Sequence, residues 1–111
     1  MRRAVIVSAV RTPVGKCRGS LASIEAYKLG AAVVKEAIKR ANISADLVDE
    51  VIFGNLMGHD INNMARMVSL EAGLPIEKPA FSIDRQCGTS LNAIALGAML
   101  IQLGEANVIV A

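Results

Sequence analysis

Residues 80–103 read AFSIDRQCGTSLNAIALGAMLIQL, and this stretch decides the fold class. It opens with Ala80–Ile83, an apolar run with the length and composition of a buried strand. Three polar residues follow as a turn, and the apolar residues then continue from Cys87 to Leu103, where Gly104 is a typical helix stop. The stretch therefore predicts a strand, a sharp turn that carries a cysteine, and a helix.

The same alternation of strands and helices continues outward from this stretch. The predicted strands are Ala4–Ala9, Val51–Gly54, Ala80–Ile83 and Asn107–Ala111, and the predicted helices are about Ile24–Ala41, Met64–Ala72 and Cys87–Leu103. Asn62 or Asn63 can cap the second of these helices, and Gly73 and Pro75 end it. Strands that alternate with helices indicate an α/β fold with a parallel sheet, right-handed crossovers and helices on both faces.

The third predicted helix is apolar on nearly every side. The stretch from Gln86 to Gly104 carries no charge, but it contains Thr89 and Asn92 and directly follows a strand. We therefore interpret it as a buried helix of a soluble protein rather than as a membrane span. A chain of 111 residues has too few elements to bury such a helix. We expect residues 1–111 to form one domain that is incomplete at its C-terminal end.

Composition excludes several classes of function. The net charge of +2 and the aromatic content of 3% offer neither a basic stripe nor stacking residues, which argues against a nucleic-acid partner. Cys17 and Cys87 are far apart in a chain without a secretory start, so we expect reduced thiols and a cytoplasmic location. Two separated cysteines and His59 are too few ligands for a metal site.

Cys87 is the candidate for chemistry. It lies where a buried strand turns into a helix, and ligands of open α/β sheets bind at the carboxyl ends of the strands. The helix start presents free N–H groups and a positive dipole end, which favour the thiolate form of the cysteine. The alternative is a structural cysteine that is buried like a small hydrophobic residue. Position alone leaves both interpretations open.

Five segments resemble the thiolase family, which includes acetyl-CoA acetyltransferases and 3-ketoacyl-CoA thiolases. In chain order they are RTPVGKCRGSL at 11–21, GN at 54–55, NMAR at 63–66, RQCG at 85–88 and GEANVIVA at 104–111. These segments have the order and spacing of the family, and the match as a whole covers essentially every residue. The chain departs from the family pattern at Cys17, Met64 and Ser90, where Phe, Pro and Gly are common.

The resemblance implies a function and a site. Cys87 would be the nucleophile that carries the acyl group, and its backbone N–H is a candidate oxyanion donor. Acyl-CoA thioesters would be the substrates, with no tightly bound cofactor and no metal. The chemistry is a Claisen condensation to 3-ketoacyl-CoA or the reverse thiolytic cleavage. The family's histidine, second cysteine and asparagine of the site have no counterpart in these residues, so we expect the chain alone to be inactive.

The resemblance also implies the strand order 3-2-1-4 with a fifth strand missing. It further implies a homodimer or tetramer formed through the third predicted strand, Ala80–Ile83. Two alternatives remain open: a non-catalytic, self-associating interaction module, and a condensing enzyme of the ketoacyl-synthase type, which the segments at 11–13 and 63–66 disfavour.

Other residues have simpler interpretations. We expect His59 to be structural or on the surface, because it matches no catalytic position of the family. Arg66 is expected to form a salt bridge near the dimer interface, and Cys17 to be inert. A group of methionines fits either a partner surface or gaps in the core, and comprises Met57, Met64 and Met67.

Overall fold

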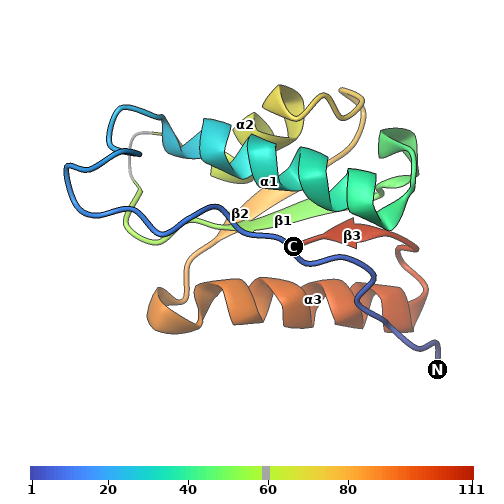
Figure 1. Cartoon of the computed structure of the whole chain (residues 1–111). Coiled ribbons are helices and arrows are strands. Elements are labelled where there is room, and N and C mark those ends of the chain that lie inside the picture. Colours follow the sequence, from blue (N-terminus) through green and yellow to red (C-terminus); the bar gives the residue numbers. More distant parts are fainter. Residues whose placement is uncertain (59–60) are drawn as a thin grey trace.

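A parallel sheet with helices on both faces forms the chain (Figure 1). The computed structural model describes residues 1–58 and 61–111. In those residues, helices α1 and α2 cover one face of the sheet and α3 covers the other (Figure 1). The predicted α/β class, the parallel pairing and the helices on both faces are confirmed. The elements are α1 (Ala26–Ala41), η1 (Ala45–Leu47), β1 (Glu50–Gly54), α2 (Met64–Glu71), β2 (Ala80–Ile83), η2 (Gln86–Gly88), α3 (Thr89–Leu103) and β3 (Ile109–Val110), where η marks a short 3-10 helix.

The strand order differs from the expected 3-2-1-4. The described strands lie in the order β2-β1-β3, and β1 pairs in parallel with both neighbours. Val51 lies opposite Ala80 on one side and opposite Val110 on the other. β3 takes the edge of β1 at Glu50 and Val51, the side on which the predicted first strand was expected, and Ala4–Ala9 pairs with neither strand. The prediction that Ala4–Ala9 is a strand of the sheet is wrong.

Asp49, directly before β1, fixes the pairing of β1 with β3. Its Oδ2 accepts the backbone N–H of Asn107 at 2.6 Å and that of Val108 at 3.1 Å. Its own N–H donates to the Val108 carbonyl at 2.8 Å. The bonds from Asn107 and then Val108 stabilise the charged form and lower the pKa of Asp49 below its usual value. One side chain thus sets the register of two segments that are far apart in the chain.

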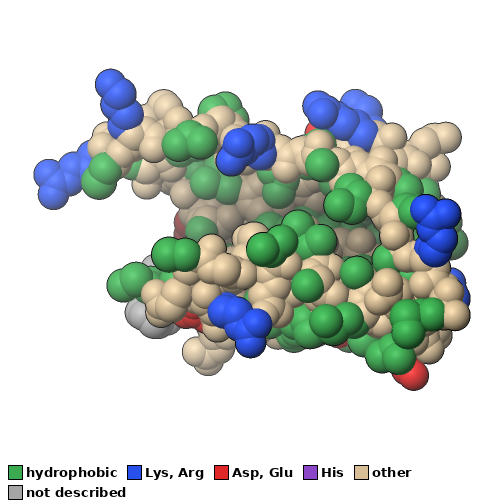
Figure 2. Space-filling model, turned by 90° about the horizontal axis from the view of Figure 1, so that it is seen from below, with side chains coloured by type: hydrophobic (Ala, Val, Ile, Leu, Met, Phe, Trp, Pro, Cys, Tyr) green, Lys and Arg blue, Asp and Glu red, His purple; other side chains and the backbone are tan. Residues whose placement is uncertain are grey.

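The N-terminal segment, residues 4–10, runs alongside the sheet without pairing to it. Val5, Ile6 and Val7 are between 66% and 75% exposed. Between this segment, the outer edge of β3 and the facing sides of α1 and α3 lies an apolar groove of about 510 Å³. Figure 2 shows a hollow between two bands of the surface, with hydrophobic side chains along both. Arg2 joins the two ends of the chain, since its Nη2 donates to Asn107 Oδ1 at 2.7 Å.

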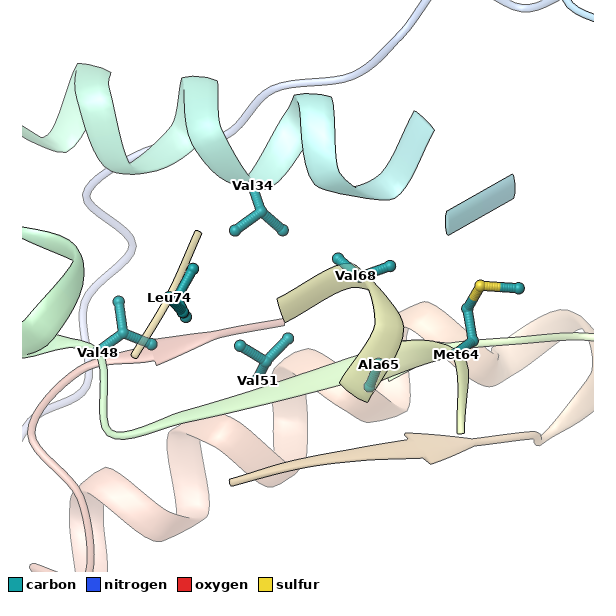
Figure 3. Packing of buried hydrophobic residues seen from close by; sticks show 7 residues of the cluster. All are labelled: Val34, Val48, Val51, Met64, Ala65, Val68 and Leu74. Carbon is teal, nitrogen blue, oxygen red and sulfur yellow. The ribbon is translucent and has the colours of Figure 1, made fainter. Parts of the chain in front are cut away.

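The hydrophobic core lies between the sheet and the α1–α2 layer (Figure 3). Gly30 of α1 sits so close to α2 that a Cβ there would come within 2.6 Å of Val68 Cγ2. On the other face of the sheet, Ile52 is fully buried, as the alternation along a strand requires. The labelled core residues are Val34, Val48, Val51, Met64, Ala65, Val68 and Leu74.

The helix ends follow local signals in the sequence. Asn63 caps α2 by accepting the N–H of Arg66, as one of the two predicted caps. Gly73 and Gly104 follow α2 and α3 with φ of 83° and 81°, a left-handed conformation that glycine adopts without strain. α1 begins two residues later than predicted, at Ala26, and α3 also begins two residues late, at Thr89.

α3 is less buried than its composition predicts. Only Thr89, Ala93 and Gly97 of this helix are buried, whereas Leu91 and Leu103 are 74% and 71% exposed. Its apolar outer face is therefore open to solvent in this chain. Among the described residues, no helix combines the length and the apolar character needed to cross a membrane.

Candidate active site

Cys87 lies on the connection between β2 and α3, within the short 3-10 helix η2. The predicted position of the cysteine between strand and helix is confirmed, although the α-helix starts only at Thr89. The thiol is free and exposed in this chain, which does not fit the alternative of a buried structural cysteine. The neighbouring strand β1 ends at Gly54, which pairs with Ile83 at the end of β2. Cys87 thus stands near the carboxyl ends of two parallel strands.

The turn before Cys87 has an unusual backbone. Gln86 has φ of 49°, a left-handed conformation that costs free energy in a residue with a side chain. Asp84 Oδ1 accepts the N–H of Gln86 at 2.9 Å. Thr89 Oγ1 accepts the N–H of Arg85 at 2.8 Å and donates to the carbonyl of Gln86 at 2.6 Å. Side chains on both sides of the turn therefore hold it.

The backbone N–H groups around Cys87 differ in whether they have a hydrogen-bond acceptor. The N–H of Gly88 donates to the Arg85 carbonyl, and the N–H of Thr89 donates to the Gln86 carbonyl. The N–H of Cys87 donates to no acceptor among the described residues. A carbonyl oxygen bound next to the thiol can accept from this group, which is what an oxyanion donor requires.

A shallow pocket of about 230 Å³ opens beside the thiol. Gly54 forms part of its wall next to α3, where an added Cβ would lie 2.5 Å from Thr89 Cγ2. Among the described residues, the lining contains no His, Asp or Glu that could act as a general base. The pocket is lined by Gly54, Leu56, Gln86, Cys87, Thr89, Ser90 and Leu91.

Asp84 and Thr89 are residues of the site that the sequence analysis missed. Their signal is local, because Asp and Thr favour side-chain bonds to the backbone of a nearby turn. Asp84 opens the polar turn three residues before Cys87, and Thr89 lies two residues after Cys87. A search for turn-forming side chains around the cysteine would have found them.

Arg66 has a structural role that differs from the predicted salt bridge. Its Nη1 donates to the Lys78 carbonyl and its Nη2 to the Ile76 carbonyl, each at 2.8 Å. The guanidinium thereby ties α2 to the segment that leads into β2. No carboxylate among the described residues lies within salt-bridge distance of it.

The remaining candidates lie apart from the cysteine or outside the described residues. His59 belongs to the latter. Met64 is buried in the core, whereas Met57 is 69% exposed, so the methionines do not form one group with one role. Cys17 is exposed on a turn of the N-terminal loop, and its inertness stays a prediction. Within the described part of the chain, no three His, Cys, Asp or Glu side chains cluster as metal ligands would.

Known proteins share this arrangement along the whole chain. Residues 4–111 match the family model described as thiolase, N-terminal domain. The chain is 47% identical to an acetyl-CoA acetyltransferase of Escherichia coli and 46% identical to a beta-ketoadipyl-CoA thiolase of Acinetobacter baylyi. In each case the alignment covers 100% of this chain and 28% of the relative.

A solved structure has the same fold. The crystal structure of the Bacillus anthracis acetyl-CoA acetyltransferase superposes with a TM-score of 0.94 and 39% identity, over 98% of this chain and 28% of that one. The chain therefore spans a little over a quarter of the length of the proteins that it matches. On the family model and these relatives together, the chain belongs to the thiolase family, and its residues 4–111 match the model of the N-terminal domain.

Proposed function

We propose that this chain supplies the nucleophile of a coenzyme-A-dependent C-acyltransferase, and that Cys87 is that nucleophile. The observation that carries the proposal is an exposed thiol on a strained turn at the carboxyl end of β2, next to an N–H that has no acceptor among the described residues. The relatives are named for acyl transfer to and from coenzyme A, which gives the substrate class.

The proposed reaction has two halves. The Cys87 thiolate attacks the carbonyl carbon of an acyl-CoA, a carbon–sulfur bond forms, and the CoA thiolate leaves and takes up a proton. A base then removes the α-proton of a second acyl-CoA, and the resulting carbanion attacks the acyl-cysteine. The Cys87 thiolate leaves as 3-ketoacyl-CoA forms, and thiolysis is the same path in reverse. No cofactor is needed, because each step is a transfer of an acyl group or a proton.

The base of the second half would come from outside the pocket beside Cys87. The described lining of that pocket holds no His, Asp or Glu, and the chain matches only 28% of its relatives. We therefore propose that residues 1–111 form an incomplete domain of a thiolase, and that they turn over no acyl-CoA by themselves. The free, exposed cysteines fit a reducing compartment such as the cytoplasm.

A chimera tests the nucleophile. Residues 1–111 replace the matching part of the Escherichia coli acetyl-CoA acetyltransferase, which supplies the rest of the protein. We expect acetoacetyl-CoA thiolysis that survives Cys17→Ser and falls by several orders of magnitude with Cys87→Ser, because serine is a far weaker nucleophile at neutral pH. A folded chimera that is equally active without Cys87, or inactive with it, would contradict the proposal.

One observation favours a second candidate function, a self-associating module without catalysis. β2 forms an edge of the sheet, and the outer face of α3 exposes apolar side chains. Such surfaces bind other chains whether or not Cys87 reacts. A chimera that assembles normally but lacks activity would support this alternative.

A further inference from the structure

We infer that Thr89 is a positioning residue for Cys87, and this inference rests on the proposed role of Cys87 as a nucleophile. Thr89 is 5% exposed and is the first residue of α3. Its side chain does not reach into bulk solvent, and it lies two residues beyond the thiol. Its contacts show how it acts on the turn that carries the thiol.

Thr89 makes three hydrogen bonds to the two residues before Cys87. Its Oγ1 accepts the N–H of Arg85 at 2.8 Å, and the same hydroxyl donates to the Gln86 carbonyl at 2.6 Å. Its own N–H also donates to the Gln86 carbonyl. The Thr89 hydroxyl thus closes a hydrogen-bonded ring of backbone that runs from Arg85, just after β2, to Thr89 at the start of α3. Cys87 lies inside this ring.

The position of the hydroxyl is set by the methyl group of the same side chain. Thr89 Cγ2 packs against Gly54 at the end of β1, so closely that a Cβ on Gly54 would lie 2.5 Å away. A β-branched side chain has few rotamers, so a fixed methyl also fixes the hydroxyl. Thr89 therefore fixes the turn relative to the sheet, through its contact with β1 as well as through the connection to β2.

The hydrogen bonds and the packing of Thr89 matter because the turn is strained. Gln86 has φ of 49°, and such a residue keeps this conformation only where its surroundings impose it. The Asp84 carboxylate fixes the Gln86 N–H from an exposed position, while Thr89 fixes the Gln86 carbonyl and the Arg85 N–H from a buried one. If the hydroxyl is lost, the Arg85 N–H loses its acceptor and the turn can relax. The thiol then moves relative to the N–H groups at the helix start.

The test measures how fast iodoacetamide alkylates Cys87 relative to Cys17 in the folded chain at neutral pH, by peptide mass spectrometry. Cys17 serves as the internal reference, because it lies on a separate exposed loop. The variants are Thr89→Val, which keeps the shape and loses the hydroxyl, and Thr89→Ser, which keeps the hydroxyl and loses the methyl. Circular dichroism and thermal unfolding are recorded for each.

In the wild-type chain we expect Cys87 to react faster than Cys17. Thr89→Val should lower the ratio of the two rates by roughly fivefold, and Thr89→Ser should keep it within about twofold of wild type. A role in stability alone would lower the melting temperature and leave the ratio of the folded protein unchanged. An unchanged or higher ratio in folded Thr89→Val would overturn the inference.

Two further outcomes are kept apart by design. If Thr89→Val does not fold, Thr89→Ser is compared with Thr89→Ala, since both lack the methyl and differ only in the hydroxyl. Equal ratios in that pair would also overturn the inference. If Cys87 of the wild-type chain reacts no faster than Cys17, the proposed nucleophile itself is wrong, and that result is distinct from a failure of Thr89.

Discussion

Gly54 ends β1 at a point where the backbone of the sheet meets the first turn of α3. A Cβ at this position would lie 2.5 Å from Thr89 Cγ2, closer than side-chain atoms approach in folded proteins. The absence of a side chain therefore does two things at once. It lets α3 start directly against the sheet, and it leaves the opening beside Cys87.

Replacement of Gly54 by alanine should destabilise the chain, since the start of α3 must move away from the sheet. We expect Gly54→Ala to lower the free energy of unfolding by about 1–3 kcal/mol, measured by urea denaturation. The matched control is Gly88→Ala, which adds the same methyl where the nearest atom is Arg85 Cγ at 3.8 Å. That control should change stability by less than about 0.5 kcal/mol. Equal losses of stability in both variants would show that the contact between Gly54 and Thr89 does not govern the stability of the chain.

For single residues, the sequence predicted the position of the cysteine but not the residues that hold its turn in place. Cys87 could be located because an apolar strand, a polar turn and an apolar helix are local patterns. Thr89 and Asp84 act through particular hydrogen bonds, and Thr89 depends on contact with Gly54, which is 35 residues away in the chain. Such a contact depends on the packing of the fold, and no local pattern records it.

Among the elements, the contact between β1 and β3 depends on Asp49. The folded carboxylate binds two N–H groups, so its pKa lies below that in the unfolded chain. The stability that it contributes is present at neutral pH and is lost as the pH falls below about 4, through the lowered pKa of the folded state.

Asp49→Asn should therefore lower the free energy of unfolding at pH 7 by about 1 kcal/mol, since a charged acceptor becomes a neutral one. The difference between wild type and variant should shrink as the pH falls toward 3. Urea denaturation across this pH range measures it. Glu77→Gln is the control, because that exposed carboxylate makes no hydrogen bond or ion pair with the described residues. A gap that stays constant with pH would refute the role of the carboxylate charge.

The elements also show where prediction from sequence stops. β1, β2 and the three α-helices were predicted within a few residues, because periodicity and capping residues are local signals. Ala4–Ala9 has an equally good apolar pattern and yet forms no strand of this sheet. Whether an apolar segment forms a strand depends on the strand that it pairs with. The segment leading into β3 is held beside β1 by hydrogen bonds to Asp49, a polar residue that lies outside every apolar run.

For the whole molecule, the partly covered outer edge of β2 predicts self-association. Asn63 Nδ2 donates to the Ala80 carbonyl on the side away from β1, whereas the Ala80 N–H on the same side donates to no acceptor among the described residues. We expect the chain to form dimers or larger species at micromolar concentration, because exposed edges beside apolar faces recruit other chains. Sedimentation velocity measures this.

The variant Ala80→Pro separates the edge from the other exposed surfaces. Proline removes an N–H that points away from β1, while the pairing of β1 with β2 can remain. Association through the β2 edge should weaken in the variant, with an unchanged circular dichroism spectrum. Undiminished association would place the interface elsewhere, with the apolar outer face of α3 as the next candidate.

The groove beside residues 4–10 affects the order in which this chain can fold. Its walls come from α1 and from both ends of the sequence, and Arg2 reaches Ala106 and Asn107. During synthesis the N-terminal segment emerges first, but its neighbours in α3 and β3 are made last. At typical elongation rates this delay is on the order of ten seconds. Val5, Ile6 and Val7 lack these contacts during that time and stay 66–75% exposed after it, so this segment is a natural target for chaperones that bind apolar segments.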